Sequence, residues 1–73
     1  MTDYGVILFH TTSAVMRAEK LFKKEGLTIK LIPTPREFSS DCGIAVRFDW
    51  SKYERVKSLL DTAGVEISAI HRL

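Results

Sequence analysis

The sequence predicts an α+β fold in which four strands and two helices follow one another in the order βαββαβ. Short runs rich in β-forming residues alternate with two segments whose apolar residues recur at helical spacing, and a glycine follows each of those segments. With 73 residues the chain has room for little else, so we expect one domain over residues 1–73. Two right-handed crossovers then place both helices on one face of a four-stranded antiparallel sheet, which is the ferredoxin-like arrangement.

The first half of the chain is predicted to form a strand, a helix and a second strand. Residues 4–10 (YGVILFH) are an apolar run that favours a buried strand, and any of the hydroxyl residues at 11–13 can cap the helix that follows. The helix ends before Gly26, and residues 27–32 (LTIKLI) alternate like a strand that Pro33 stops. The apolar stripe of the helix consists of Ala14, Val15, Ala18, Leu21 and Phe22.

The second half repeats this pattern. Residues 43–48 (GIAVRF) are predicted to form the third strand, and Asp49 or Ser51 can cap the second helix. Gly64 ends that helix, and residues 65–70 form the last strand. One face of the third strand carries Ile44, Val46 and Phe48, and the other carries Ala45 and Arg47. The core stripe of the second helix consists of Tyr53, Val56, Leu59, Leu60 and Ala63.

One face of the predicted sheet has no helix over it. We expect Ile7, Phe9 and Ile32 to point toward this open face. A second copy of the chain could cover these apolar side chains, because a domain of this size is only marginally stable alone. A homodimer through the open face is therefore one expectation.

Composition excludes several classes of function. Hydrophobic residues make up 45% of the chain and charged residues 27%, which is ordinary for a soluble protein, and a formal charge of +2 is too small to imply a nucleic-acid partner. A single cysteine excludes an internal disulfide framework and a multi-cysteine metal site, and it fits a reducing cytosol. Signal-peptide and membrane-span patterns are missing. We expect a cytoplasmic protein with no cofactor, no metal, no nucleic acid and no membrane partner.

Cys42 is the residue most suited to chemistry. It lies in residues 33–43 (PTPREFSSDCG), the longest stretch without helical or strand periodicity. Buried structural cysteines usually lie within apolar runs, whereas this one is flanked by Asp41 and Gly43. We therefore expect an accessible thiol, and an accessible thiol can react.

The predicted topology gives Cys42 a neighbourhood. The loop before the third strand and the turn after the first strand lie at the same end of the sheet, and these two strands pair. Cys42 should then lie near the N-terminus of the first helix, where free N–H groups and the helix dipole stabilise a thiolate. Arg36 and His10 could add positive charge. The expected binding residues around Cys42 are His10, Thr11, Thr12, Ser13, Arg36, Ser39, Ser40 and Gly43.

The string LIPTPREFSSDCGIAV resembles the signature of a small family of selenium/sulfur carrier-like proteins. The matching elements are Pro33 and Pro35 before Arg36, then Ser39, then the Cys42–Gly43 pair. The segment FHTTS after the first strand and the helix with Glu19 also resemble the start of the family, so the resemblance spans nearly the whole chain. It implies a role in bacterial selenium or sulfur handling, with Cys42 as the carrier residue and with donor and acceptor proteins as partners.

Three functions remain open. In the first, Cys42 accepts sulfur or selenium as a persulfide or its selenium analogue, as a stoichiometric carrier rather than an enzyme with turnover. In the second, the chain is a small ligand-binding or regulatory module that acts as a dimer. The third, binding of single-stranded RNA on the open face, is disfavoured because Ile44 and Val46 stand where stacking aromatics are needed. A copper-chaperone role is excluded. It needs the motif Cys-x-x-Cys just after the first strand, and residues 10–13 read HTTS there.

Overall fold

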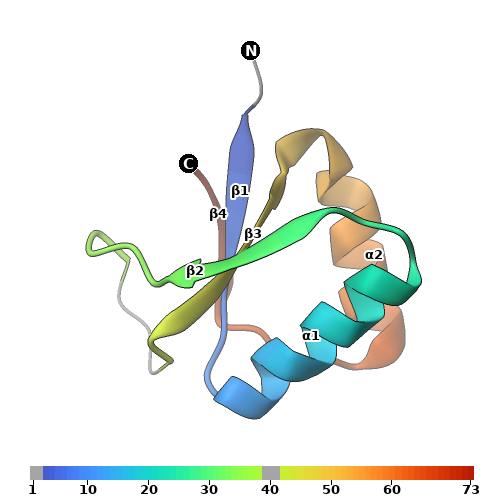
Figure 1. Cartoon of the computed structure of the whole chain (residues 1–73), viewed down its shortest axis with the longest axis horizontal. Helices are drawn as coiled ribbons and strands as arrows, with labels where there is room; N and C mark the ends of the chain where they lie inside the picture. Colours follow the sequence, from blue (N-terminus) through green and yellow to red (C-terminus); the bar gives the residue numbers. More distant parts are fainter. Residues whose placement is uncertain (1–2, 39–41) are drawn as a thin grey trace.

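A computed structural model describes residues 3–38 and 42–73 and shows four antiparallel strands in one sheet, with two helices packed against it (Figure 1). The strand order is β2-β3-β1-β4. This arrangement confirms the predicted α+β fold with βαββαβ order. The elements are β1 (Tyr4–Leu8), α1 (Thr12–Lys24), β2 (Ile29–Pro33), β3 (Ile44–Asp49), a 3₁₀ turn η1 (Trp50–Lys52), α2 (Tyr53–Ala63) and β4 (Ala69–Arg72).

The register of the sheet aligns apolar side chains in rows. Ile7 on β1 pairs with Val46 on β3 and with Ile70 on β4, and Val46 pairs in turn with Leu31 on β2. Side chains of directly paired residues lie on the same face of a sheet, so this row forms one apolar surface, and the helices pack against it. The buried residues between sheet and helices form a cluster that we call the helix-side core: Ile7, Phe9, Ala14, Val15, Ala18, Phe22, Cys42, Val46, Phe48, Val56, Leu60 and Val65.

Three of the four helix ends follow the sequence predictions. The expected cap of α2 by Asp49 or Ser51 is wrong, because Lys52 precedes that helix and makes no side-chain capping hydrogen bond. Thr11 is the N-cap of α1, and its side-chain oxygen accepts a hydrogen bond from the Ala14 backbone N–H at 3.2 Å. Gly26 and Gly64 lie just past the two helices with φ angles of 75° and 68°. This left-handed conformation is the one that ends helices and that glycine adopts without steric cost.

The sequence did not predict the 3₁₀ turn η1 that separates β3 from α2. Asp49 caps it: Oδ1 accepts hydrogen bonds from the Ser51 backbone N–H at 3.0 Å and from the Ser51 hydroxyl at 2.8 Å. Both hydrogen bonds lower the pKa of Asp49 below its ordinary value of 3.8, and the bond from the Ser51 backbone N–H makes the larger contribution.

This cap predicts an acid-sensitive contribution to stability. Because the pKa of Asp49 is lower in the folded chain, its carboxylate stabilises the fold above the unfolded-state pKa, and this contribution is lost as the pH falls through the folded-state pKa. We expect the difference in urea midpoint between wild type and Asp49→Ala to be largest near neutral pH and to shrink below about pH 4. Ser58→Ala, on the exposed face of α2, removes no titratable group and should show no such shrinkage. A difference for Asp49→Ala that stays constant down to about pH 2 would contradict the role of this cap.

The last strand begins later than predicted. Residues 65–70 were expected to form it, but β4 is Ala69–Arg72. Val65 is instead buried in the helix-side core, and its N–H donates to the Leu60 carbonyl at 3.1 Å at the end of α2. Pairing with β1 starts only where the Ser68 N–H donates to the Leu8 carbonyl at 2.7 Å. The apolar residues after α2 thus pack under the helix before the chain enters the sheet.

The expected open-face positions of Ile7 and Phe9 are wrong, because both side chains belong to the helix-side core. Val6 and Leu8 face the other way, and together with Ala45 they form a second buried set, the outer-face cluster. Ile32 packs against this cluster and therefore lies on the face that was expected for it. A strand that is apolar on both faces does not reveal from its pattern which side points to the helices.

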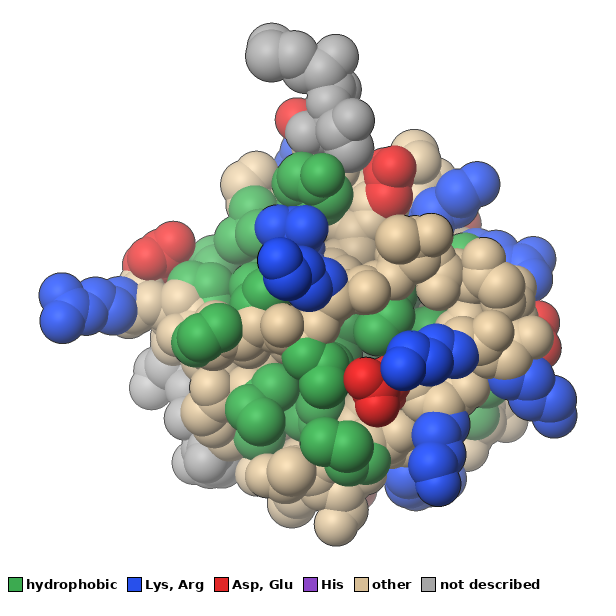
Figure 2. All heavy atoms as spheres, viewed as in Figure 1, with side chains coloured by type: hydrophobic (Ala, Val, Ile, Leu, Met, Phe, Trp, Pro, Cys, Tyr) green, Lys and Arg blue, Asp and Glu red, His purple; other side chains and the backbone are tan. Residues whose placement is uncertain are grey.

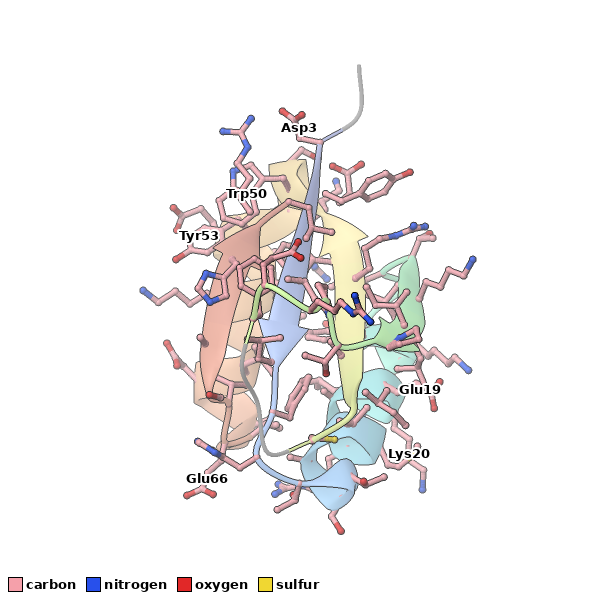
Figure 3. All side chains as sticks on the ribbon, turned by 90° about the vertical axis from the view of Figure 1, so that its left-hand side faces the viewer. Asp3, Glu19, Lys20, Trp50, Tyr53 and Glu66 are labelled. Carbon is pink, nitrogen blue, oxygen red and sulfur yellow. The ribbon has the colours of Figure 1, made fainter. Side chains whose placement is uncertain are left out.

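Part of the outer face is covered by the chain itself. Phe38 packs against the outer-face cluster, and its ring stacks on His71 of β4 with centroids 4.2 Å apart and planes 4° apart. Figure 3 shows the segment after β2 crossing in front of β3 and β1. A partner copy would have to dock beside this segment, so the surface expected for a homodimer is smaller than the whole sheet face.

The remaining surface is polar on the helix side. Figure 2 shows Lys and Arg side chains concentrated at the right of the view, where the helices lie in Figure 1. In the described part of the chain, no helix has both the length and the apolar character that a membrane crossing requires.

Candidate functional site

Cys42 lies just before β3, and its side chain continues the helix-facing row of that strand. It is 5% exposed and belongs to the helix-side core, so the expectation of an accessible thiol is wrong. The reason is the period of two along a strand: residue 42 has the same parity as Val46 and Phe48, which point toward the helices. Gly43, the next residue, has the opposite parity and is exposed.

The first turn of α1 lies against the sulfur. Cys42 Sγ is 3.8 Å from the hydroxyl oxygen of Thr12, the first residue of the helix, and either atom can be the donor. Cys42 thus lies at the helix N-terminus, where the topology had placed it. The first N–H groups of a helix have no partners within it, and the positive end of the dipole favours negative charge.

The sequence reasoning missed Thr34, which positions the backbone around Cys42. Its hydroxyl donates to the Cys42 carbonyl at 2.8 Å, and its N–H donates to the Gly43 carbonyl at 3.0 Å. These bonds join the end of β2 to the start of β3 and fix the sulfur-bearing residue between them. A threonine between two prolines carries no distinctive signal of such a role, because hydroxyl residues are common in turns.

The other predicted residues of the helix turn take different positions. Thr11 is occupied by its capping bond to Ala14. His10 and Ser13 are exposed on either side of this cap. The structure places the Thr12 hydroxyl against the sulfur.

The predicted loop residues are only partly brought together. Arg36 is exposed in the turn closed by the Phe38 N–H to Pro35 carbonyl bond of 3.0 Å, and it forms no ion pair with any described residue. Gly43 contributes its backbone carbonyl to Thr34. Ser39 and Ser40 lie outside the described residues. Phe38, an aromatic residue in a polar loop, was the available signal that this loop is anchored on the sheet.

Two alternative chemistries can be compared with the structure. Across residues 3–38 and 42–73 there is no cluster of three or more His, Cys, Asp or Glu side chains that could hold a metal ion. Ile44 and Val46, the positions compared with the stacking residues of RNA-binding sheets, belong to or pack against the helix-side core. The apparent match to an RNA-binding strand therefore falls on the covered face of the sheet.

Comparison with known proteins identifies the family of this chain. No curated protein and no solved structure matches the chain. A family model described as "Putative Se/S carrier protein-like" matches residues 4–72, from the start of β1 to the end of β4. Because the match includes nearly every residue, Cys42 and its surroundings included, the chain belongs to this selenium/sulfur carrier-like family.

Proposed function

We propose that the protein carries sulfur or selenium as a covalent adduct on Cys42. The observation that carries this proposal is the contact of Cys42 Sγ with Thr12 at the N-terminus of α1, 3.8 Å from its hydroxyl oxygen. A carrier needs one nucleophilic sulfur whose charged form is stabilised, and helix N-termini provide that stabilisation. The family description supports the same assignment.

The loading step is a balanced exchange between two sulfur compounds. The Cys42 thiolate attacks the outer sulfur of a donor persulfide, R–S–SH, and forms a new S–S bond. The S–S bond of the donor breaks, and its electron pair leaves with the donor thiolate, so no external oxidant is consumed. An acceptor thiolate unloads the carrier by attacking the outer atom in turn, which returns Cys42 as a thiolate. Selenium as the outer atom follows the same sequence.

The chain has one cysteine, so it cannot form an internal disulfide that would discharge the adduct. The adduct therefore persists until an acceptor arrives. This favours a stoichiometric carrier over an enzyme with turnover, and it assigns donor and acceptor proteins as the partners.

Intact mass spectrometry tests the loading step. Reduced protein is incubated with glutathione persulfide, and we expect wild type to gain the mass of one sulfur atom that a reductant removes. Cys42→Ala should gain nothing. A wild-type protein without mass gain, or an equal gain on Cys42→Ala, would refute the carrier function. A parallel incubation with the selenium analogue of the donor compares the rates for the two elements.

The role of Thr12 is tested by two substitutions at the same position. Thr12→Val keeps the shape of the side chain and removes the hydroxyl, whereas Thr12→Ser keeps the hydroxyl. We expect Thr12→Val to slow loading by about tenfold, the loss of one hydrogen bond to a charged sulfur, and Thr12→Ser to load at nearly the wild-type rate. Equal rates for Val and Ser variants would show that the hydroxyl takes no part.

A further inference from the structure

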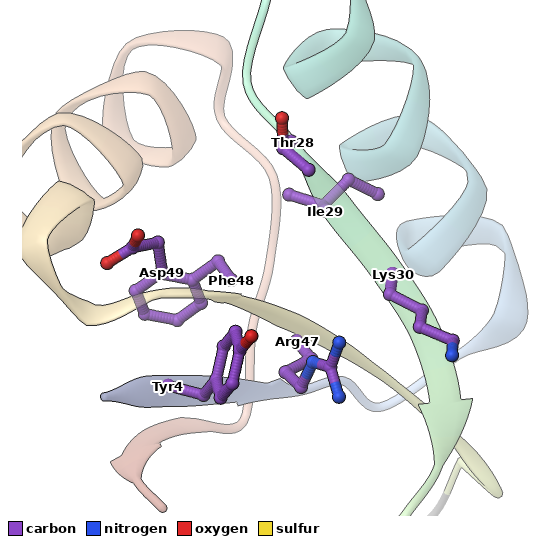
Figure 4. A pocket seen from close by; sticks show the side chains of 7 residues that line it. All are labelled: Tyr4, Thr28, Ile29, Lys30, Arg47, Phe48 and Asp49. Atoms are coloured by element: carbon purple, nitrogen blue, oxygen red, sulfur yellow. The ribbon is translucent and has the colours of Figure 1, made fainter. Parts of the chain in front are cut away.

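We propose that a hollow at the far end of the sheet from Cys42 binds a small organic anion through Lys30 and Arg47. The hollow has a volume of about 500 Å³ and lies where the start of β2 meets the end of β3 (Figure 4). This volume is within the range of small-molecule sites. The proposal does not depend on the carrier function, because Cys42 is at the opposite end of β3.

Two cations face each other across the strands of this hollow. Lys30 on β2 and Arg47 on β3 are direct partners in the antiparallel register. Like charges in this relation are destabilising unless an anion lies between them. Among the described residues no carboxylate forms an ion pair with either one. By contrast, Arg55 and Arg72 are each paired with an acid.

Arg47 is held in a position suited to binding. Its guanidinium carbon lies 4.3 Å from the centre of the Tyr4 ring, and its side chain is half-buried. Stacking on an aromatic face orients the guanidinium while the N–H groups on its edge stay available. A carboxylate or phosphate can accept two parallel hydrogen bonds from such an edge.

The other walls of the hollow favour an organic ligand. The exposed Tyr4 ring supplies apolar surface beside Arg47, and apolar surface is the usual lining of a small-molecule site. Ile29 and Phe48 also border the hollow, but their side chains pack on the helix side of the sheet. Asp49 is the only carboxylate among the lining residues, and its Oδ1 already accepts two hydrogen bonds from Ser51. Two cations against one acid leave the hollow positive. The chemistry therefore fits a monoanion or phosphate monoester with an apolar body.

Titration followed by amide NMR shifts tests the site, with phenyl phosphate, benzoate and inorganic phosphate as probes. We expect phenyl phosphate to shift the amides of residues 28–30 and 47–49, with dissociation constants of the order of 1 mM. Lys30→Gln and Arg47→Gln should each weaken binding by about tenfold. Lys20→Gln, the same change of charge on the exposed face of α1, should leave binding unchanged.

The remaining outcomes of the titration either support the site or overturn it. Stronger binding of phenyl phosphate than of benzoate identifies a phosphate ligand, and the reverse identifies a carboxylate, both in support of the site. Absence of localised shifts, or equal weakening by Lys20→Gln, would overturn it. Equal affinities for inorganic phosphate and phenyl phosphate would contradict the proposal that the ligand is an organic anion. A short single-stranded RNA that binds the same residues more tightly than all three probes would replace it with a nucleic-acid surface.

Discussion

Replacing Gly5 by alanine is expected to destabilise the protein by about 1–3 kcal/mol, the cost of forcing extra atoms into a packed core. A Cβ at this position would lie 2.5 Å from the ring of Phe48 and 2.6 Å from the ring of Trp50. Phe48 is 2% exposed and stacks on Trp50, so neither ring can move without disturbing the other. The measurement is the urea midpoint, with the slope of the transition as a check on two-state unfolding.

Gly43→Ala is the matched control. A Cβ at Gly43 has no atom within 4 Å, and the φ angle of Gly43 is not positive. We expect its stability to stay within about 0.5 kcal/mol of wild type. Phe48→Leu in the Gly5→Ala background should recover part of the loss, because it removes the ring atoms that clash. Equal stabilities for the two alanine variants would show that no close contact exists at Gly5.

The second large effect concerns access to Cys42. Because Sγ is buried, we expect iodoacetamide to modify the native protein at least about tenfold more slowly than the urea-unfolded chain. Phe38→Ala removes the stacking on His71 and the packing on the outer-face cluster, the contacts that anchor the segment leading to Cys42. This variant should raise the native rate about tenfold, equivalent to about 1.4 kcal/mol of lost anchoring.

Tyr4→Ala is the control for this experiment, since it truncates an aromatic side chain on the same sheet face outside the loop contacts. Its modification rate should stay close to wild type at equal stability. Low urea concentrations distinguish local from global opening. The modification rate rises with urea at these concentrations if Cys42 is exposed by global unfolding, and stays nearly constant if it is exposed by local opening. A native rate equal to the unfolded one, or equal rates for Phe38→Ala and Tyr4→Ala, would contradict an anchored, buried Cys42.

The sequence was most informative where local chemistry decides the structure. Gly26 and Gly64 marked helix ends correctly, and the cap of α1 is one of the three hydroxyl residues at 11–13, because capping depends on a few neighbouring residues. Alternation in β3 placed Val46 and Phe48 on the same face because Ala45 and Arg47 between them differ in size or polarity. These signals, with the order of elements, were enough to predict the fold.

The failures arose where packing over a distance decides. The apolar run of β1 does not reveal that Ile7 faces the helices, because both faces of the strand are apolar. The burial of Cys42 follows from its parity with β3, a relation hidden by its polar neighbours. Thr34 and Phe38 act through contacts with residues distant in the chain. The contact of Thr34 leaves no pattern in a single sequence, and that of Phe38 leaves only an aromatic residue in a polar loop.

The place of the sulfur within the core has a consequence for a carrier. An adduct on Cys42 adds an atom to a region packed as densely as a crystal, and such interiors accommodate extra volume only by shifting neighbouring groups. The empty and loaded forms should therefore differ in shape around α1 and the segment held by Thr34. A donor and an acceptor could each recognise one of these shapes, so that the cargo itself determines which partner the protein meets next.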